Sequence, residues 1–341
     1  MEAKSSLKPE MILAGDIGGT KTLLGMFDAG SPRPTPVAVR AFATLEYRDL
    51  PSMIDDFLRG EQREQTRFGT ACFGVAGPVI EDSAELTNVP WRVDARRVAA
   101  AFEIERVGLL NDLEAMVYSL PVLHSAEVHV LQRGDTRRGG NMALIAAGTG
   151  LGEALIHKVG SRFIPSASEG GHADFCARTE REIALLRDLT ARYGRGDVEH
   201  VLSGRGLVNI HRVVHTSPCA AGVDLDQADA PAMISTAALE GRCAGCVETL
   251  DLFVDAYGAE AGNLALRSVS TGGLFIGGGI APKILSALTA GAFMRAFCAK
   301  PPLEPMLAAM PVSVILNAEA GLLGAAVFAA QFFSSTTRPS T

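Results

Sequence analysis

The strongest constraint on the fold is a strand–turn–strand pattern that occurs twice in the sequence. Residues 12–27 read ILAGDIGGTKTLLGMF, in which two apolar runs flank a glycine turn at residues 18–20. Residues 142–157 read MALIAAGTGLGEALIH and have the same order around residues 148–150. Each pattern predicts two strands joined by a tight turn. The repetition predicts a duplicated chain of two lobes.

The two glycine turns suit a phosphate ligand. Glycines in a tight turn allow backbone N–H groups to point into one concavity, which binds anions. Asp16, next to the first turn, is a candidate for holding the water shell of Mg²⁺. The first turn is not followed by a helix and does not end in Gly-Lys-Ser/Thr, which argues against a Walker loop. A single turn of this kind is also typical of a plain β-hairpin, but the second copy favours a nucleotide site.

Composition narrows the class of protein. The chain has 341 residues, enough for roughly two domains. Its formal net charge of −7 argues against nucleic-acid and membrane-surface partners, which select basic clusters. The first ten residues lack the apolar core of a signal peptide, and the longest apolar stretch, 321–333, is too short for a membrane span. We therefore expect a cytoplasmic protein.

The six cysteines are scattered, as expected of reduced thiols. Cys243 and Cys246 form one C-x-x-C motif on a predicted amphipathic helix, where they are expected to serve as small apolar side chains. A zinc site would need two further ligands, and the sequence shows no partner pair for the motif. Whether the two thiols respond to oxidants stays open.

Strands and helices alternate along the chain, which indicates an α/β fold with parallel pairing in each lobe. Strands are predicted at 37–44, 70–75, 107–110, 274–276 and 312–316. Helices are predicted at 52–59, 94–102, 113–119, 179–193, 198–203, 206–214, 233–256, 259–268 and 319–332.

Three further stretches have polar or glycine-rich sequences that suit ligand binding. Asn111 and Asp112 stand where a strand gives way to a helix, and an aspartate there can accept a hydroxyl proton in phosphoryl transfer, although it can equally cap the helix. Glu169 and His172, within SEGGH, can hydrogen-bond the hydroxyls of a sugar or form a polar loop. The stretch 271–283, TGGLFIGGGIAPK, can pass beneath an adenosine without side-chain obstruction.

In this order and spacing the motifs resemble bacterial glucokinase, a family of the actin-like sugar kinase superfamily. The resemblance spans about residues 12–328. The matching segments are GDIGGTKT (15–22), FGVAGPV (73–79), LTNVPW (86–91), LLNDLEA (109–115), AAGTGLG (146–152), SEGGHADF (168–175), HVLSGRGLVNI (200–210), GNLAL (262–266) and GGLFIGGGIAPKIL (272–285).

The resemblance implies a two-lobed actin-like (ribonuclease H-like) α/β fold with a ligand cleft between a small and a large domain. The small domain would comprise residues 1–122, completed by a C-terminal helix at 318–333. The large domain would comprise residues 123–317, and 334–341 would be a disordered tail. Members of the family are commonly homodimers.

The resemblance also implies ATP-dependent phosphorylation of the 6-hydroxyl of D-glucose, the entry step of glycolysis, with ATP and Mg²⁺ as cofactors. Asp112 would be the general base, and Asp16 would hold Mg²⁺ through water. The implied glucose ligands are Gly77, Asn88, Asn111, Asp112, Glu169, His172 and Glu199. The implied nucleotide-binding residues are Asp16, Gly18, Gly19, Thr20, Lys21, Gly148, Thr149, Gly150, Gly277, Gly278 and Gly279.

Two rival functions remain from the sequence. One altered contact can shift a sugar kinase to fructose, mannose or an amino sugar. A non-catalytic sugar-sensing regulator would be expected to lack Asp112 or one phosphate turn, and this chain has all three. The helix-turn-helix and the zinc-binding cysteine cluster of the related repressor and kinase group are absent from the sequence. ADP or polyphosphate as donor also stays open.

Overall fold

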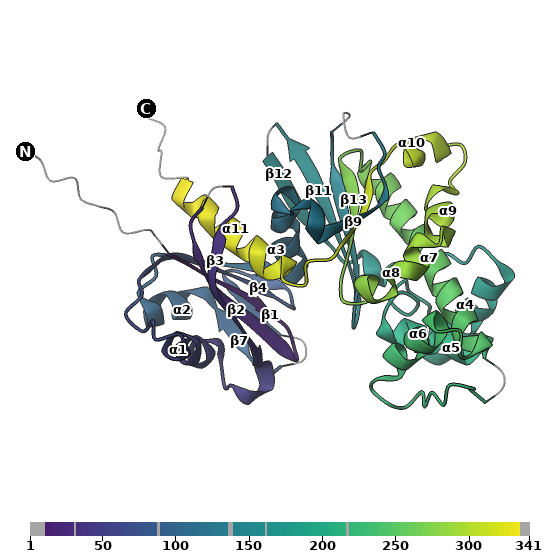
Figure 1. Ribbon diagram of the computed structural model, residues 1–341, viewed down its shortest axis with the longest axis horizontal. Coiled ribbons are helices and arrows are strands. Elements are labelled where there is room, and N and C mark those ends of the chain that lie inside the picture. The colour runs from purple at the N-terminus through teal and green to yellow at the C-terminus, as the bar shows by residue number, and fades with distance from the viewer. Residues whose placement is uncertain are drawn as a thin grey trace, which may run out of the picture. The chain divides into compact units, whose positions relative to one another are not determined.

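The computed structural model describes residues 11–30, 32–86, 89–135, 139–160, 162–215 and 218–334 (Figure 1). The chain divides into two compact units. The first holds the described residues up to His124 and from Asn317 onward, and the second holds Ser125–Leu316. Of the tail predicted at 334–341, Ser334 ends the last helix and the rest lies outside the described residues. In the described parts of the chain, every helix is too short or too polar to cross a lipid bilayer.

The first unit is built on a five-stranded sheet with the order β3-β2-β1-β4-β8. Its strands are β1 (Met11–Ile17), β2 (Lys21–Asp28), β3 (Thr35–Ala43), β4 (Phe68–Val75) and β8 (Arg106–Asn111). The first three strands pair antiparallel, and β1, β4 and β8 pair parallel. A small second sheet contains β5 (Val79–Ile80), β6 (Ser83–Glu85) and β7 (Arg92–Asp94).

The second unit repeats this sheet and adds one strand, in the order β12-β11-β10-β13-β14-β9. Its strands are β10 (Met142–Ala147), β11 (Leu151–Val159), β12 (Arg162–Ser168), β13 (Gly273–Gly277), β14 (Val312–Ile315) and β9 (Val128–Gln132). β12, β11 and β10 are antiparallel, β10, β13 and β14 are parallel, and β9 is added antiparallel at the edge. The two glycine hairpins therefore occupy equivalent places in two sheets of the same design.

The helices follow the expected caps in several places. In the first unit they are α1 (Leu50–Gly60), α2 (Ala95–Phe102), α3 (Asp112–Ser119) and α11 (Ala320–Ser334). In the second unit they are α4 (Glu180–Tyr193), α5 (Gly204–Val214), α6 (Ala230–Leu239), α7 (Ala244–Ser268), α8 (Leu285–Thr289), α9 (Ala292–Cys298) and α10 (Glu304–Ala308). Asp94 caps α2, and Thr179 with Glu182 forms the predicted capping box of α4.

Two helix predictions in the second unit are wrong. Residues 198–203 form turns, because Ser203 accepts a hydrogen bond from the Gly206 N–H and so starts α5 only at Gly204. The helices predicted at 233–256 and 259–268 are instead α6 and an unbroken α7. A turn at Gly241, with φ of +67°, separates α6 from α7. Gly258 does not break α7, because the missing Cβ allows the backbone of Phe293 in α9 to pack against it.

The C-terminal helix α11 packs within the first unit. Leu322, Ala325, Ala326 and Ala329 share an apolar cluster with residues of β1, β4, β8 and α3. At Gly324 a Cβ would lie 1.6 Å from the carbonyl oxygen of Ala115, so glycine is required where α11 crosses α3. The last helix in the sequence thus packs on strands near its beginning. The Thr70 hydroxyl adds a hydrogen bond to the Ala329 carbonyl at 3.2 Å, between residues more than 250 positions apart.

Candidate active site

The predicted site residues fall into two groups, one in each unit. In the first unit the described ones lie at or just after the carboxyl ends of β1, β4 and β8. In the second unit the glycine loops follow β10 and β13, whereas Glu169 and His172 follow β12 and Glu199 lies between α4 and α5. The carboxyl ends of parallel strands are the edges at which α/β sheets place ligand-binding residues. Asn88 lies outside the described residues.

The first glycine turn joins β1 to β2 and is held from the side by Thr44. The Gly18 N–H donates to the Lys21 carbonyl at 3.1 Å, and the Thr44 hydroxyl donates to the Gly18 carbonyl at 2.9 Å. The Thr44 N–H donates to the Thr20 carbonyl at 3.0 Å. Thr22 is fully buried and hydrogen-bonded to Thr44, so its hydroxyl is part of this support and does not face a ligand.

Asp16 is the last residue but one of β1 and lies close to the charge of Asp112. Burial, and next the negative charge of Asp112, raise the pKa of Asp16 to about 6, while Lys21 acts in the opposite direction. Gly321 leaves room for this carboxylate, because a Cβ there would lie 2.7 Å from Asp16 Oδ2. Two carboxylates that repel one another at the end of a sheet are a favourable place for a divalent cation.

Asn111 and Asp112 sit at the junction of β8 and α3. Asn111 is the N-cap: its Oδ1 accepts the Leu113 N–H at 3.0 Å, and its Nδ2 donates to the Gly77 carbonyl at 3.3 Å. Asp112 is the first residue of α3, and its Oδ1 also accepts the Leu113 N–H, at 2.9 Å. The structure therefore brings Gly77, Asn111 and Asp112 together. Asn111 and Asp112 share the capping of α3, so the helix does not depend on Asp112 alone.

In the second unit, two glycine loops meet at the ends of parallel strands. The Gly148 N–H donates to the Gly150 carbonyl at 2.8 Å within the turn between β10 and β11. The third glycine loop follows β13, where Gly278 has a φ of +81° and lies against the Ala147 backbone. A Cβ at Gly148 or Gly279 would meet no atom within 4 Å, so both backbones are open to a ligand on that side.

The N-terminus of α5 also lies at the second turn. The Gly204 N–H donates to the Gly148 carbonyl at 2.9 Å, which fixes the start of this 11-residue helix against the turn. The positive end of the helix dipole adds to the attraction of this edge for phosphate.

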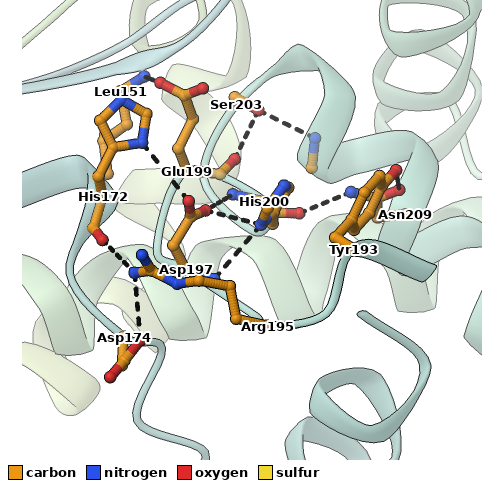
Figure 2. A network of polar contacts seen from close by, with 11 residues as sticks. Leu151, His172, Asp174, Tyr193, Arg195, Asp197, Glu199, His200, Ser203 and Asn209 are labelled. Carbon is orange, nitrogen blue, oxygen red and sulfur yellow. Dashed lines mark hydrogen bonds and ion pairs between the residues drawn. The ribbon is translucent and has the colours of Figure 1, made fainter. Parts of the chain in front are cut away.

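Glu199 connects the Glu169–His172 segment to the turn between β10 and β11 (Figure 2). The Glu199 N–H donates to the Gly171 carbonyl at 2.8 Å, and Glu199 Oε2 accepts the Leu151 N–H at 3.0 Å. Glu169 and His172 are exposed, whereas Glu199 is half-buried beside Gly150. The structure therefore places the Glu169–His172 segment, Glu199 and the second glycine turn next to one another within one unit.

Asp197 contacts this candidate site and was not predicted from the sequence. Its Oδ2 lies 3.4 Å from His172 Nδ1, and its Oδ1 accepts the His200 N–H at 2.8 Å (Figure 2). Asp197 is buried, while the imidazole of His172 is 56 % exposed. The buried carboxylate therefore orients an accessible imidazole. An acid two residues before Glu199 was the available signal.

Glu153 on β11 was also missed. It is 1 % exposed, and among the described residues none hydrogen-bonds its Oε1. It lies under the start of the Glu169–His172 segment, because a Cβ at Gly170 would be 2.2 Å from its Oε2. Burial, and then the charge of Glu260, raise the pKa of Glu153 to about 7, and Arg267, at 3.8 Å, opposes them.

One expectation about the cysteines is wrong. Cys243 and Cys246 do have a partner pair, since His215 and Cys219 lie beside them. The sequence did not reveal it because the partners precede the motif by more than 20 residues.

Comparison with known proteins agrees with the fold and the order of the motifs. The glucokinase family model matches residues 13–332. A glucokinase of Nostoc punctiforme is 38 % identical over 94 % of this chain and 99 % of its own length. The crystal structure of a glucokinase from an Antarctic psychrotroph has a TM-score of 0.83 and 30 % identity, and covers 95 % of this chain and 100 % of its own.

A glucokinase of the ROK family from Streptomyces griseus, at 22 % identity and a TM-score of 0.63, shares the fold over 94 % of this chain and 99 % of its own. The first two relatives exceed the similarity at which family membership is secure, and the family model covers nearly the whole chain. This chain belongs to the glucokinase family.

Proposed function

We propose that this chain transfers the γ-phosphoryl group of ATP to the 6-hydroxyl of D-glucose, with Mg²⁺, at the entry of glycolysis. The observation that carries the proposal is Asp112 at the start of α3, beside Asn111, in a chain of the glucokinase family. The solved Streptomyces griseus relative is in complex with glucose and AMPPNP, which supports the same pair of ligands here.

Asp112 is proposed as the general base. It accepts the proton of the sugar 6-hydroxyl while that oxygen attacks the γ-phosphorus, and the bond from phosphorus to the leaving ADP oxygen breaks. General-base assistance of this kind contributes about 10²–10⁴ in rate. Because Asn111 caps α3, the helix does not require the Asp112 carboxylate as its cap.

The phosphates are proposed to bind the two glycine turns, Gly18–Thr20 and Gly148–Gly150, with Lys21 beside the first. Gly277–Gly279 would lie beneath the adenosine. Backbone N–H groups suit this task because their orientation is fixed before the charge of the transition state develops. An acidic chain can therefore bind a nucleotide with few basic side chains.

The residues present fit a magnesium ion. Burial, and next the negative charge of Asp112, raise the pKa of Asp16, and a divalent cation bound there would favour its charged form. When bound, Mg²⁺ neutralises charge on the transferring phosphoryl group. Asp16 would hold it through its water shell.

The sugar is proposed to be recognised by Glu169, His172 and Glu199 from the second unit, with Asn111, Gly77 and Asn88 from the first. Binding of the sugar would bury these polar groups. A hexose that lacks a matching hydroxyl would leave one of them without a hydrogen-bond partner, which lowers the binding free energy.

Replacing Asp197 by asparagine is expected to raise the KM for glucose by about 10- to 100-fold, the cost of a hydrogen bond to a charged group, with a smaller change in kcat. Asparagine keeps an oxygen for the His200 N–H but removes the charge that faces His172. Steady-state kinetics with glucose as the varied substrate checks the split.

Asp174→Asn is the matched control, because Asp174 is 87 % exposed and pairs at 3.1 Å with Arg195, which lies in the same loop as Asp197. An Asp197→Asn variant whose KM equals that of wild type would show that the His172–Asp197 contact does not position the sugar.

Two further properties belong to the proposal. A homodimer is expected from the family, and light scattering of the purified chain tests it. A cytoplasmic location is supported by the six cysteines, all of which are free thiols in the structure.

The first experiment is a coupled assay for sugar phosphate formation with ATP and Mg²⁺, run on glucose, fructose, mannose, glucosamine and N-acetylglucosamine. ADP and polyphosphate replace ATP in parallel reactions. The proposal expects glucose to have the highest kcat/KM and ATP to be the donor. Preference for another hexose would mean that the Glu169–His172 segment is arranged to bind that sugar and not glucose. Glucose binding without turnover on any sugar would favour a sugar-sensing regulator.

A further inference from the structure

A group of soft metal ligands lies in the second unit and includes none of the residues of the proposed active site. His215 follows α5, Cys219 lies in the connection after it, Cys243 is the N-cap of α7 and Cys246 is in its first turn. His211 completes the group. The five side chains form two triads that share Cys219, each with its donor atoms within 4.8 Å of one another.

Three of the distances within the group suit ligands around one ion. Cys219 Sγ lies 3.7 Å from the Sγ atoms of both Cys243 and Cys246, and His215 Nε2 lies 3.2 Å from Cys243 Sγ. Four ligands placed tetrahedrally at the usual Zn–S distance of about 2.3 Å would have sulfur atoms about 3.8 Å apart. A disulfide would instead bring two sulfurs to about 2.05 Å.

We propose that Cys219, Cys243, Cys246 and His215 bind one Zn²⁺ ion. Three thiolates and one imidazole form a closed tetrahedral set, which is typical of structural zinc and leaves no open position for a substrate. The C-x-x-C motif provides two ligands from the start of α7, and the segment after α5 provides the other two.

The surroundings of His215 support a fixed ligand. A Cβ at Gly245, between the two cysteines of the motif, would lie 2.0 Å from His215 Cδ2, so the ring packs directly on the glycine backbone. A larger residue at this position would displace the imidazole from the cysteines.

His211 lies beside the four proposed ligands and connects α5 to α7. Its Nδ1 is 2.9 Å from the Thr249 hydroxyl, which donates to the Gly245 carbonyl at 2.6 Å. This contact ties the last turns of α5 to the first turn of α7. His211 therefore positions the ligand-bearing segments, while His215 lies nearer to the Cys243 sulfur.

The ion would fix the N-terminus of the most buried helix of the unit. Phe253 and Tyr257 of α7 are fully buried, and the Ala147 N–H donates to the Tyr257 hydroxyl at 3.3 Å, next to the second glycine turn. Zinc is thus expected to act on the stability of the second unit and not on the chemical step.

The test begins with the full wild-type chain, purified without chelator and analysed for metals by mass spectrometry. The proposal expects about one zinc per chain. Removal with a chelator, followed by titration with Co²⁺, should give the intense ligand-to-metal bands of a tetrahedral thiolate site. A thiol reagent should find three more reactive cysteines in the metal-free chain than in the zinc-loaded chain.

Cys243→Ser should lose zinc and the cobalt spectrum, whereas Cys176→Ser, which changes an exposed cysteine outside the cluster, should keep both. The thiol count on wild type keeps the test decisive if Cys243→Ser fails to fold. A wild-type chain that takes up neither Zn²⁺ nor Co²⁺ would overturn the proposal, as would a native mass that reveals a disulfide among the three cysteines.

Discussion

Replacing Asp112 by asparagine is expected to lower kcat for glucose phosphorylation by about 10²–10⁴ while glucose binding is retained. The amide cannot accept the hydroxyl proton, but it has the size of the carboxylate and keeps an oxygen near the Leu113 N–H. The fold should survive, because Asn111 caps α3 independently of Asp112. Calorimetric titration with glucose and the coupled assay together separate binding from turnover.

Asp94→Asn is the matched control for this substitution. Asp94 also stands at the start of a helix of the first unit, where its carboxylate caps α2, and asparagine caps nearly as well. The control is expected to keep wild-type turnover. If Asp112→Asn kept a tenth or more of the wild-type kcat, the proton would have to leave by another route and the assignment of Asp112 as base would fail.

The same substitution bears on the metal. Loss of the Asp112 charge removes the second-largest influence on Asp16, so the pKa of Asp16 should fall towards its ordinary value of 3.8, although burial still raises it. The same substitution removes one of the two negative charges that would attract the cation, so a decrease in apparent Mg²⁺ affinity of the nucleotide complex is expected to accompany the loss of turnover.

Local patterns were sufficient to predict the parts of the fold that depend on neighbours in sequence. The two hairpins followed from apolar runs on either side of glycine turns, and the α4 capping box followed from Thr179 and Glu182. The position of Asp112 followed from a strand that ends in two polar residues. In each case the residues that decide the structure lie within a few positions of one another.

The missed features depend on contacts between distant segments. His172 and Asp197 are 25 residues apart, and Cys219 and Cys243 are 24 apart. Such pairings depend on how loops and helices fold back on a sheet, which the periodicity of a single segment does not encode.

Glu153→Gln is the second substitution with a large expected effect, and its effect depends on pH. The pKa of Glu153 is raised from 4.5 to about 7 by burial and by Glu260, against the opposing charge of Arg267. Below pH about 4.5 the carboxyl group is protonated in the folded and unfolded chain alike and adds no pH dependence. From there to pH about 7 the unfolded chain gives up a proton that the folded chain retains, so the free energy of unfolding falls as the pH rises.

Above pH 7 the penalty is complete, and a shift of this size corresponds to about 3 kcal/mol of lost stability. Glutamine cannot ionise, so the stability of Glu153→Gln relative to wild type should increase by about this amount between pH 4.5 and 7 and then stay level. Urea unfolding of both proteins at half-unit steps of pH measures it. Glu180→Gln, an exposed carboxylate in the first turn of α4, controls for the change in net charge.

Parallel stability curves for Glu153→Gln and wild type would mean that Glu153 carries the same number of protons in both states, and that Arg267 compensates its burial. A rising difference would instead mean that the chain keeps a destabilising carboxyl group under Gly170, where its Oε2 lies against the segment that carries His172. Natural proteins retain such costs mainly where function requires them. The buried acid would then be part of what holds the Glu169–His172 segment in place.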